Sequence, residues 1–128
     1  MLKKSDLAYF TGTERYTHGP LRRFVMTDGV THLCDHGCSW LVDLIASHQT
    51  KALQDKSEGF QEWHLQQTSN AEAVVECRDG NLDTLLSQSI EYTDFPFDEF
   101  PNGIKIWLQH GSIDGRNMVW VAMLPSEH

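Results

Sequence analysis

The sequence predicts an α+β fold, in which a meandering antiparallel sheet packs against one main helix over residues 39–49. A short N-terminal helix is expected to precede the sheet. Three observations lead to this prediction: apolar residues alternate along most of the second half, the period lengthens after Gly37, and turn sequences separate the alternating segments. A chain of 128 residues is expected to form a single domain, 1–128.

The stretch 22–49 is expected to organise the fold. Residues 24–27 and 30–34 are β-prone runs, and a tight turn at Asp28-Gly29 is expected to join them, because Asp-Gly favours two-residue hairpins. Apolar residues then recur at helical spacing, and Ser39 is in a position to cap this helix. A hairpin followed by an amphipathic helix indicates a sheet with one covered face.

The remaining elements follow from local patterns. A short helix is expected over 5–11 and a short strand over 13–18, and the polar stretch 50–59 is expected to be a helix tail and surface loop. The later strands are expected at 61–65, 73–78, 86–92, 104–109 and 118–123, with a proline-containing loop at 94–103. Strands that follow one another through short turns are antiparallel.

Charge and composition exclude several classes of function. The net charge is −8, and residues 55–100 hold two Lys/Arg against eleven Asp/Glu, so this segment disfavours direct binding to nucleic acid or anionic membranes. No apolar run approaches the roughly 18 residues of a membrane span, and the N-terminus lacks the apolar core of a signal peptide. Three cysteines without an export signal predict reduced thiols and a cytoplasmic location.

Two features predict a homodimer. The strand 118–123 is apolar on both faces, and Trp107 falls on the polar face of its own strand. A second chain would cover these side chains. The N-terminal helix lying on the second face of the sheet is the alternative explanation.

The run 32–38 holds the most suggestive candidate site. Imidazole and thiolate suit zinc, so the side chains of this run, joined by His48, are candidate metal ligands: His32, Cys34, His36 and Cys38. Their spacing matches no common zinc finger, and buried packing of the cysteines is the competing interpretation. Cys34 or Cys38 beside a histidine is also a candidate nucleophile, because a helix N-terminus lowers a thiol pKa. We therefore assign no catalytic, cofactor or metal residue.

Two further features have a functional and a structural interpretation. His48 falls on the apolar stripe of the main helix, where it is either a base or ligand in a pocket or a hydrogen-bonded residue at the helix C-terminus. The acidic, aromatic stretch 91–100 is either a partner-binding surface or a solvated loop whose aromatic side chains rest on the core.

Short motifs spread from end to end support a resemblance. They are Phe10-Thr11-Gly12-Thr13-Glu14, Thr27-Asp28-Gly29-Val30, Trp40-Leu41, Asp43, Ile45-Ala46, Gln61, Trp63, Leu65, Cys77, Asp79-Gly80, Tyr92-Thr93-Asp94-Phe95-Pro96 and Leu124-Pro125-Ser126-Glu127. On these residues the chain resembles an uncharacterised family of small bacterial and phage- or plasmid-borne proteins. The resemblance implies one self-contained domain and no particular activity or cofactor.

The sequence thus leads to three hypotheses about function. The first is a small cytosolic accessory or protein-interaction domain, homodimeric and without a catalytic site or cofactor. The second is a metal-binding or enzymatic module built on the 32–38 run with His48. The third is an acidic decoy of nucleic acid that binds a basic protein partner.

Overall fold

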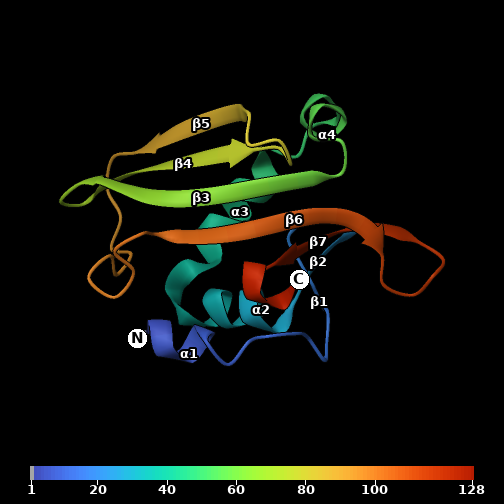
Figure 1. Cartoon of the computed structure of the whole chain (residues 1–128), viewed down its shortest axis with the longest axis horizontal. Coiled ribbons are helices and arrows are strands. Elements are labelled where there is room, and N and C mark those ends of the chain that lie inside the picture. The colour runs from blue at the N-terminus through green and yellow to red at the C-terminus, as the bar shows by residue number, and fades with distance from the viewer. Residues whose placement is uncertain (1) are drawn as a thin grey trace.

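The chain folds around one seven-stranded sheet in the order β1-β2-β7-β6-β3-β4-β5 (Figure 1). A computed structural model describes residues 2–128. The strands are β1 Thr17–His18, β2 Phe24–Met26, β3 Phe60–Ser69, β4 Glu72–Arg78, β5 Thr84–Ile90, β6 Ile104–Ser112 and β7 Met118–Met123. The helices are α1 Lys4–Leu7, α2 Asp28–Leu33, α3 Ser39–Ser47 and α4 Lys51–Ser57. A kinked segment at Cys34–Cys38 joins α2 to α3, and a 3₁₀ turn lies at Pro125–Glu127.

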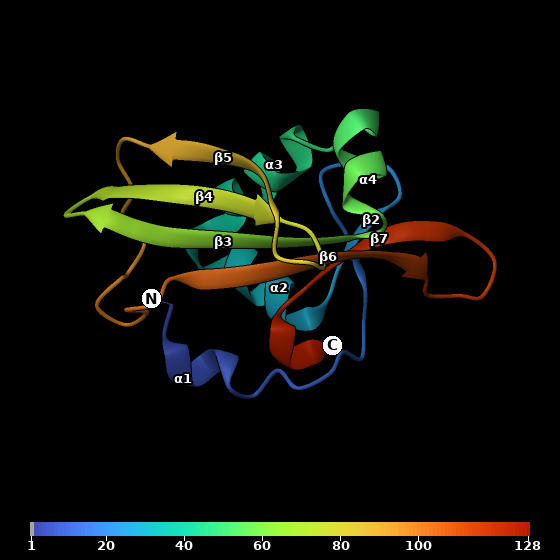
Figure 2. The ribbon, with the colours of Figure 1, turned by 45° about the horizontal axis from the view of Figure 1, so that its top comes forward.

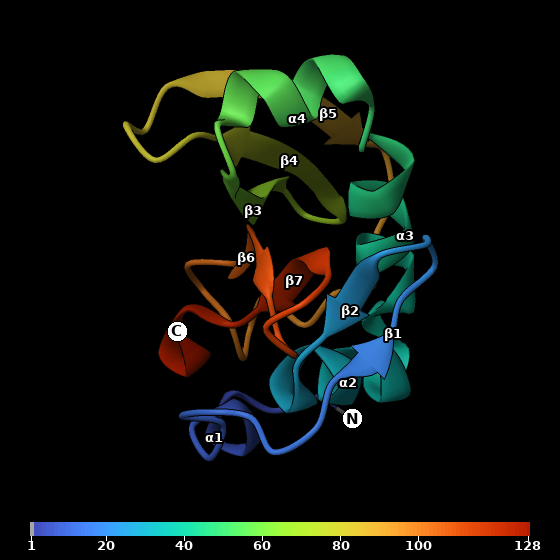
Figure 3. The same ribbon diagram turned by 90° about the vertical axis from the view of Figure 1, so that its right-hand side faces the viewer.

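Five of the six strand pairings are antiparallel, which confirms the predicted α+β class. The pairing of β2 with β7 is parallel and joins segments far apart in the sequence, with Val25 opposite Val121. The helices α2 and α3 lie against one face of the sheet (Figure 3). None of the helices in the described part of the chain is long and apolar enough to cross a membrane.

The predicted hairpin at Asp28-Gly29 is wrong, because these residues begin helix α2 instead of a turn. Val30 and Leu33 are both fully buried, and their i, i+3 spacing places them on one face of a helix, whereas on a strand they would point to opposite faces. Thr27 is extended at the N-cap, and the Thr31 N–H donates to the Thr27 carbonyl at 2.9 Å. The covering layer therefore consists of two helices in place of one.

The two helices meet at a kink. Gly37 has φ +92°, a value that favours glycine, although a Cβ at this position would meet nothing within 4 Å. Helix α3 begins directly afterwards and confirms the expected helix near 39–49. The predicted Ser39 cap is wrong: Cys38 is the N-cap residue, and its side chain makes no capping hydrogen bond.

Several element boundaries differ from the predicted ones. Residues 51–57 form helix α4 because Thr50 caps it, accepting from the Leu53 N–H at 3.2 Å. The N-terminal helix ends at Leu7, and the first strand contains only residues 17–18. Strand β5 ends at Ile90, so Tyr92 lies outside it and is 76% exposed.

The main core lies between the sheet and the helices. Side chains of the central strands alternate as predicted, with Trp63 and Leu65 facing inward and His64 facing outward. On β4 the inward set is Ala73, Val75 and Cys77.

A second apolar cluster on the opposite face is buried within the single chain. It consists of Val25, Val121 and Met123, with Trp107 and Val119 packed at its margin. Helix α1 does not cover this face, since it lies beside the start of β6, near Ile104, and near Leu124, which follows β7 (Figure 2). The apolar character of β7 therefore does not require a second chain, and the homodimer stays a prediction.

Candidate functional site

The carboxylate of Glu127 holds the junction between β2 and α2. Its Oε1 accepts from the Thr27 hydroxyl at 2.6 Å, and its Oε2 accepts from the Gly29 N–H at 2.9 Å. Oε1 also accepts from the Leu124 N–H at 3.0 Å, so this largely buried side chain is well supplied with donors. A carboxylate at the N–H groups of a helix start is favoured by the helix dipole.

Gly29 is required by this arrangement. A Cβ at position 29 would lie 2.5 Å from Oε1 of Glu127 and 2.6 Å from the Leu124 side chain. The N-terminal segment closes the same junction: Thr13 Oγ1 accepts from the Asp28 N–H at 3.0 Å, and Asp28 Oδ2 accepts from the Glu14 N–H at 2.9 Å. Three of the motifs that carry the family resemblance thus meet here as a structural joint.

The structure separates most of the candidate metal ligands. His32 and His36 stack with ring centroids 3.9 Å apart, whereas Cys34 packs on Met26 with 3.7 Å between the sulfur atoms. Cys38 is buried in the core. Among the described residues, no group of three or more His, Cys, Asp or Glu side chains converges on a possible metal position. The geometry gives the metal hypothesis no support.

The same environments do not favour thiolate chemistry. Burial, with a smaller contribution from nearby carboxylates, raises the pKa of Cys34 and of Cys38 to about 11; these carboxylates are Asp35 at Cys34 and Asp94 at Cys38. Burial and the neighbouring His36 lower the pKa of His32. Both thiols are therefore protonated at neutral pH, so the helix start near Cys38 does not activate it.

His48 is hydrogen-bonded at the end of α3. Its Nε2 lies 2.6 Å from Gln88 Oε1 on β5, and its ring stacks on Trp63 at a centroid distance of 5.8 Å. This arrangement matches the structural interpretation of His48. This hydrogen bond connects the end of α3 directly to β5, the outermost strand of the sheet.

A buried amide network lies beside Trp63, the ring on which His48 stacks. Its only signal in the sequence is a polar residue, Gln61, in an apolar strand. Gln61 and Gln49 exchange two hydrogen bonds of 2.8 and 3.0 Å. Gln61 also accepts from Trp63 Nε1 at 2.8 Å and donates to Ser57. Since the amide of Gln61 is satisfied on both ends, the network fixes α4 to β3.

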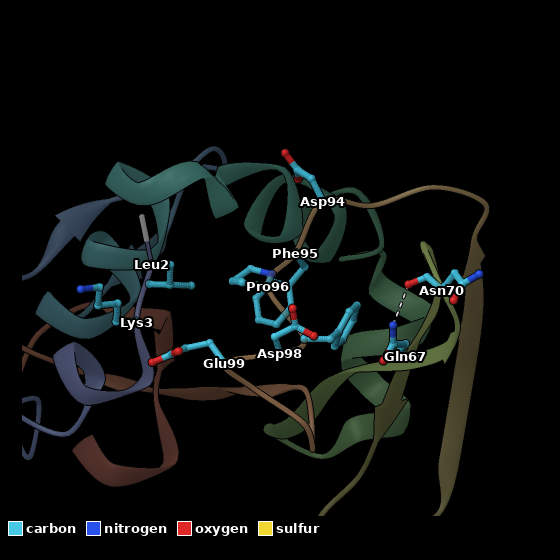
Figure 4. A pocket seen from close by; sticks show the side chains of 10 residues that line it. Leu2, Lys3, Gln67, Asn70, Asp94, Phe95, Pro96, Asp98 and Glu99 are labelled. Carbon is cyan, nitrogen blue, oxygen red and sulfur yellow. Dashed lines mark hydrogen bonds between the residues drawn. The ribbon is translucent and has the colours of Figure 1, made fainter.

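The loop between β5 and β6 combines buried rings with exposed carboxylates. Phe95, Phe97 and Phe100 are 5–7% exposed, as the interpretation of a solvated loop with aromatics on the core requires. A depression of about 380 Å³ lies beside this loop (Figure 4). Asp98 and Glu99 lie at its rim, whereas Asp94 points away from them (Figure 4).

The outer strand β5 is a surface feature that no local sequence pattern predicted. It is the last strand of the sheet, and its backbone makes no hydrogen bond to any segment other than β4 within residues 2–128. Its seven residues, Thr-Leu-Leu-Ser-Gln-Ser-Ile, include no charged residue and no proline. Only the final strand order shows that it lies at an edge.

The fold is of the α+β class, and β5 forms one outer edge of its sheet within residues 2–128. The profile of a family of unknown function, DUF6876, matches residues 1–128, and the protein belongs to this family. No curated protein and no solved structure matches the chain significantly.

Proposed function

We propose that the protein is a protein-interaction domain that accepts an extended segment of another polypeptide along β5. The observation that carries this proposal is the unpaired edge of β5 within the described residues. In an antiparallel pair, alternate residues direct their N–H and C=O groups to opposite sides, so about half of those on β5 face away from β4. Such an edge is a template for strand addition.

The composition of β5 supports the same proposal. Protein edges are commonly protected by charged residues, proline or short length, and β5 has none of these over seven residues. Leu86 and Ile90 are only partly buried, although they pack against the main core. An added strand would remove further apolar surface of these two side chains from water.

The test is selection from a random peptide library against the immobilised protein, followed by amide hydrogen exchange. Peptides that bind as a strand are expected to slow exchange at alternate residues of β5. Ser87→Pro and Gln88→Pro remove adjacent N–H groups that point to opposite sides. The variant that keeps the native unfolding transition is expected to lose peptide binding. Selected peptides that protect another surface, or no selected peptide, would overturn the proposal.

A second copy of the chain is the competing occupant of this edge. The predicted homodimer would bring together two chains of net charge −8, and the acidic segment 55–100 includes β5 itself. Sedimentation equilibrium over a hundredfold concentration range separates the two occupants, because only self-pairing raises the mass.

The predicted cytosolic location is supported by three free thiols, which suit a reducing compartment.

A further inference from the structure

We infer that the segment accepted by β5 is basic at both ends and apolar at alternate positions between them. This inference rests on the proposed function of β5 and specifies its partner. It combines two observations: where the carboxylates near β5 lie, and which side chains of β5 face the helices.

Carboxylates flank both ends of the uncharged strand. Asp83 precedes β5 and Glu91 follows it, and both side chains are exposed. Neither forms a salt bridge in the described part of the chain. Arg78, the nearest cation on the neighbouring strand, is 3.3 Å from Glu76. The two flanking charges are therefore available to a partner.

Few positively charged side chains lie near the start of β5. Lys51 and Lys56 lie on α4, which approaches this end of the strand (Figure 1). Neither pairs with Asp83 within residues 2–128. Asp79 adds a further carboxylate, although its Oδ1 already accepts from the N–H groups of Asn81 and Asp83 at 2.9 and 3.0 Å. Glu91 supplies the flanking charge at the other end of the strand.

The distance between the flanking charges sets the spacing in the partner. Eight residue steps separate positions 83 and 91, and at about 3.3 Å per residue an extended chain covers roughly 26 Å. An incoming strand would therefore place Lys or Arg residues about eight positions apart. A single basic cluster would reach only one end of β5.

The register of β5 sets the pattern between these ends. Leu86 and Gln88 lie opposite Cys77 and Val75, whose side chains are fully buried, so they share the face toward the helices. Ser87 and Ser89 face the other way and are exposed. An added strand continues this alternation, with apolar side chains beside Leu86 and polar ones beside the serines.

The same charges disfavour self-pairing. In a twofold antiparallel pairing centred on Ser87, Asp83 of one copy would lie opposite Glu91 of the second copy at both ends. Like charges directly opposite one another destabilise a strand pair. A segment with basic ends would instead place a positive charge near each of these two carboxylates.

The test is to determine the sequences of the library peptides that slow amide exchange in β5. They are expected to carry Lys or Arg at both ends, about eight positions apart, and alternating apolar residues between. Asp83→Asn and Glu91→Gln should each weaken binding about two- to fivefold at low salt. The matched variant Glu14→Gln, which removes an exposed charge near β1, should leave it unchanged.

The outcomes separate the inference from the proposal beneath it. Peptides that protect β5 but lack basic ends, or that bind Asp83→Asn and Glu91→Gln as well as the unaltered protein, overturn the inference and leave strand addition standing. Binding by peptides that never protect β5 overturns both. Self-pairing of the protein at β5 overturns the inference alone.

Discussion

The two edges of the sheet are built in opposite ways. At one edge, β1 has two residues, both exposed, and Gly19-Pro20 follows directly. At the other edge, β5 has seven uncharged residues and no further strand beside it within residues 2–128. The first edge is too short to template another strand, whereas the second is not. One side of the sheet, which we call the closed side, therefore ends in a strand too short to pair further, whereas the other ends in a long uncharged strand.

The largest effect is expected at the closed side. Glu127→Ala leaves the Thr27 hydroxyl and the N–H groups of Gly29 and Leu124 without their acceptor. We expect the free energy of unfolding to fall by about 4 kcal/mol, because each buried donor loses a charged partner. Urea denaturation measures this change, and amide exchange should quicken first in β2.

Two control variants accompany this prediction. Glu127→Gln keeps an acceptor oxygen and is expected to lose roughly half as much stability. Ser126→Ala removes an exposed hydrogen bond to the Phe10 carbonyl and should change stability by less than about 1 kcal/mol. Equal losses for Glu127→Ala and Ser126→Ala would show that the closed side does not depend on this carboxylate.

The next largest effect is expected in the difference between the free energies of local opening of β5 and of β2. Cys77 lies opposite Leu86 of β5, and burial raises its pKa to about 12, with Asp79 adding to the shift. We expect its alkylation to proceed through opening of β5. A Val25→Cys variant places a matched buried thiol on β2, between β1 and β7. Cys77 should react at least about tenfold faster, which corresponds to about 1.4 kcal/mol in opening free energy.

The pH dependence of this reaction has a defined sign. The folded pKa of Cys77 is raised above the open-state value, which lies near 8.5 to 9. Protection by the closed state is therefore complete below that open-state value and is lost as pH rises toward the folded value. Alkylation rates measured between pH 7 and 10 should increase accordingly. A rate that does not change across this range would contradict the prediction, because it would mean that the opening step, and not the thiolate fraction of the open state, limits the reaction.

A smaller effect is expected for the contact that connects α3 to β5. Gln88→Ala removes the partner of His48 Nε2 and should lower the free energy of unfolding by about 1 kcal/mol. The matched variant Ser89→Ala, on the exposed face, should change it by less than about 0.5 kcal/mol. Indistinguishable urea midpoints for the two variants would show that this contact does not support the edge.

The smallest effect is expected at β1. Thr17 is exposed and pairs with Met26 in a strand of two residues. Thr17→Ala should change stability by less than about 0.5 kcal/mol and leave peptide binding at β5 unchanged. A loss of peptide binding would mean that the two edges are coupled through the sheet.

The second half of the fold was predictable because its patterns are local. Alternation in Ile104, Ile106 and Leu108, together with turn sequences, defined the strands correctly. The error at Asp28-Gly29 arose because the same dipeptide suits both a hairpin and the first turn of a helix. The deciding partner, Glu127, lies 98 residues from Gly29 and gives no local signal.

The candidate site was predictable only in part. The structural interpretation of His48 could be stated from its position on α3, but its partner Gln88 could not. The run from His32 to Cys38 suggested metal chemistry because neighbours in sequence were assumed to converge. In the structure Cys34 packs on Met26, away from the stacked histidines, and Cys38 follows the kink at Gly37 into the core. The open edge depends on the order of all seven strands, which no local pattern encodes.

The parallel pairing of β2 with β7 also has a consequence for the order in which the chain folds during synthesis. Val25 leaves the ribosome long before Val121, its neighbour in the sheet, has been translated. The segment from β3 to β6 has antiparallel neighbours close in sequence and is free to assemble first. Until β7 and Glu127 have been translated, β2 in the nascent N-terminal quarter is an apolar strand without its hydrogen-bonding neighbour. During this interval we expect β2 to be accessible to chaperones.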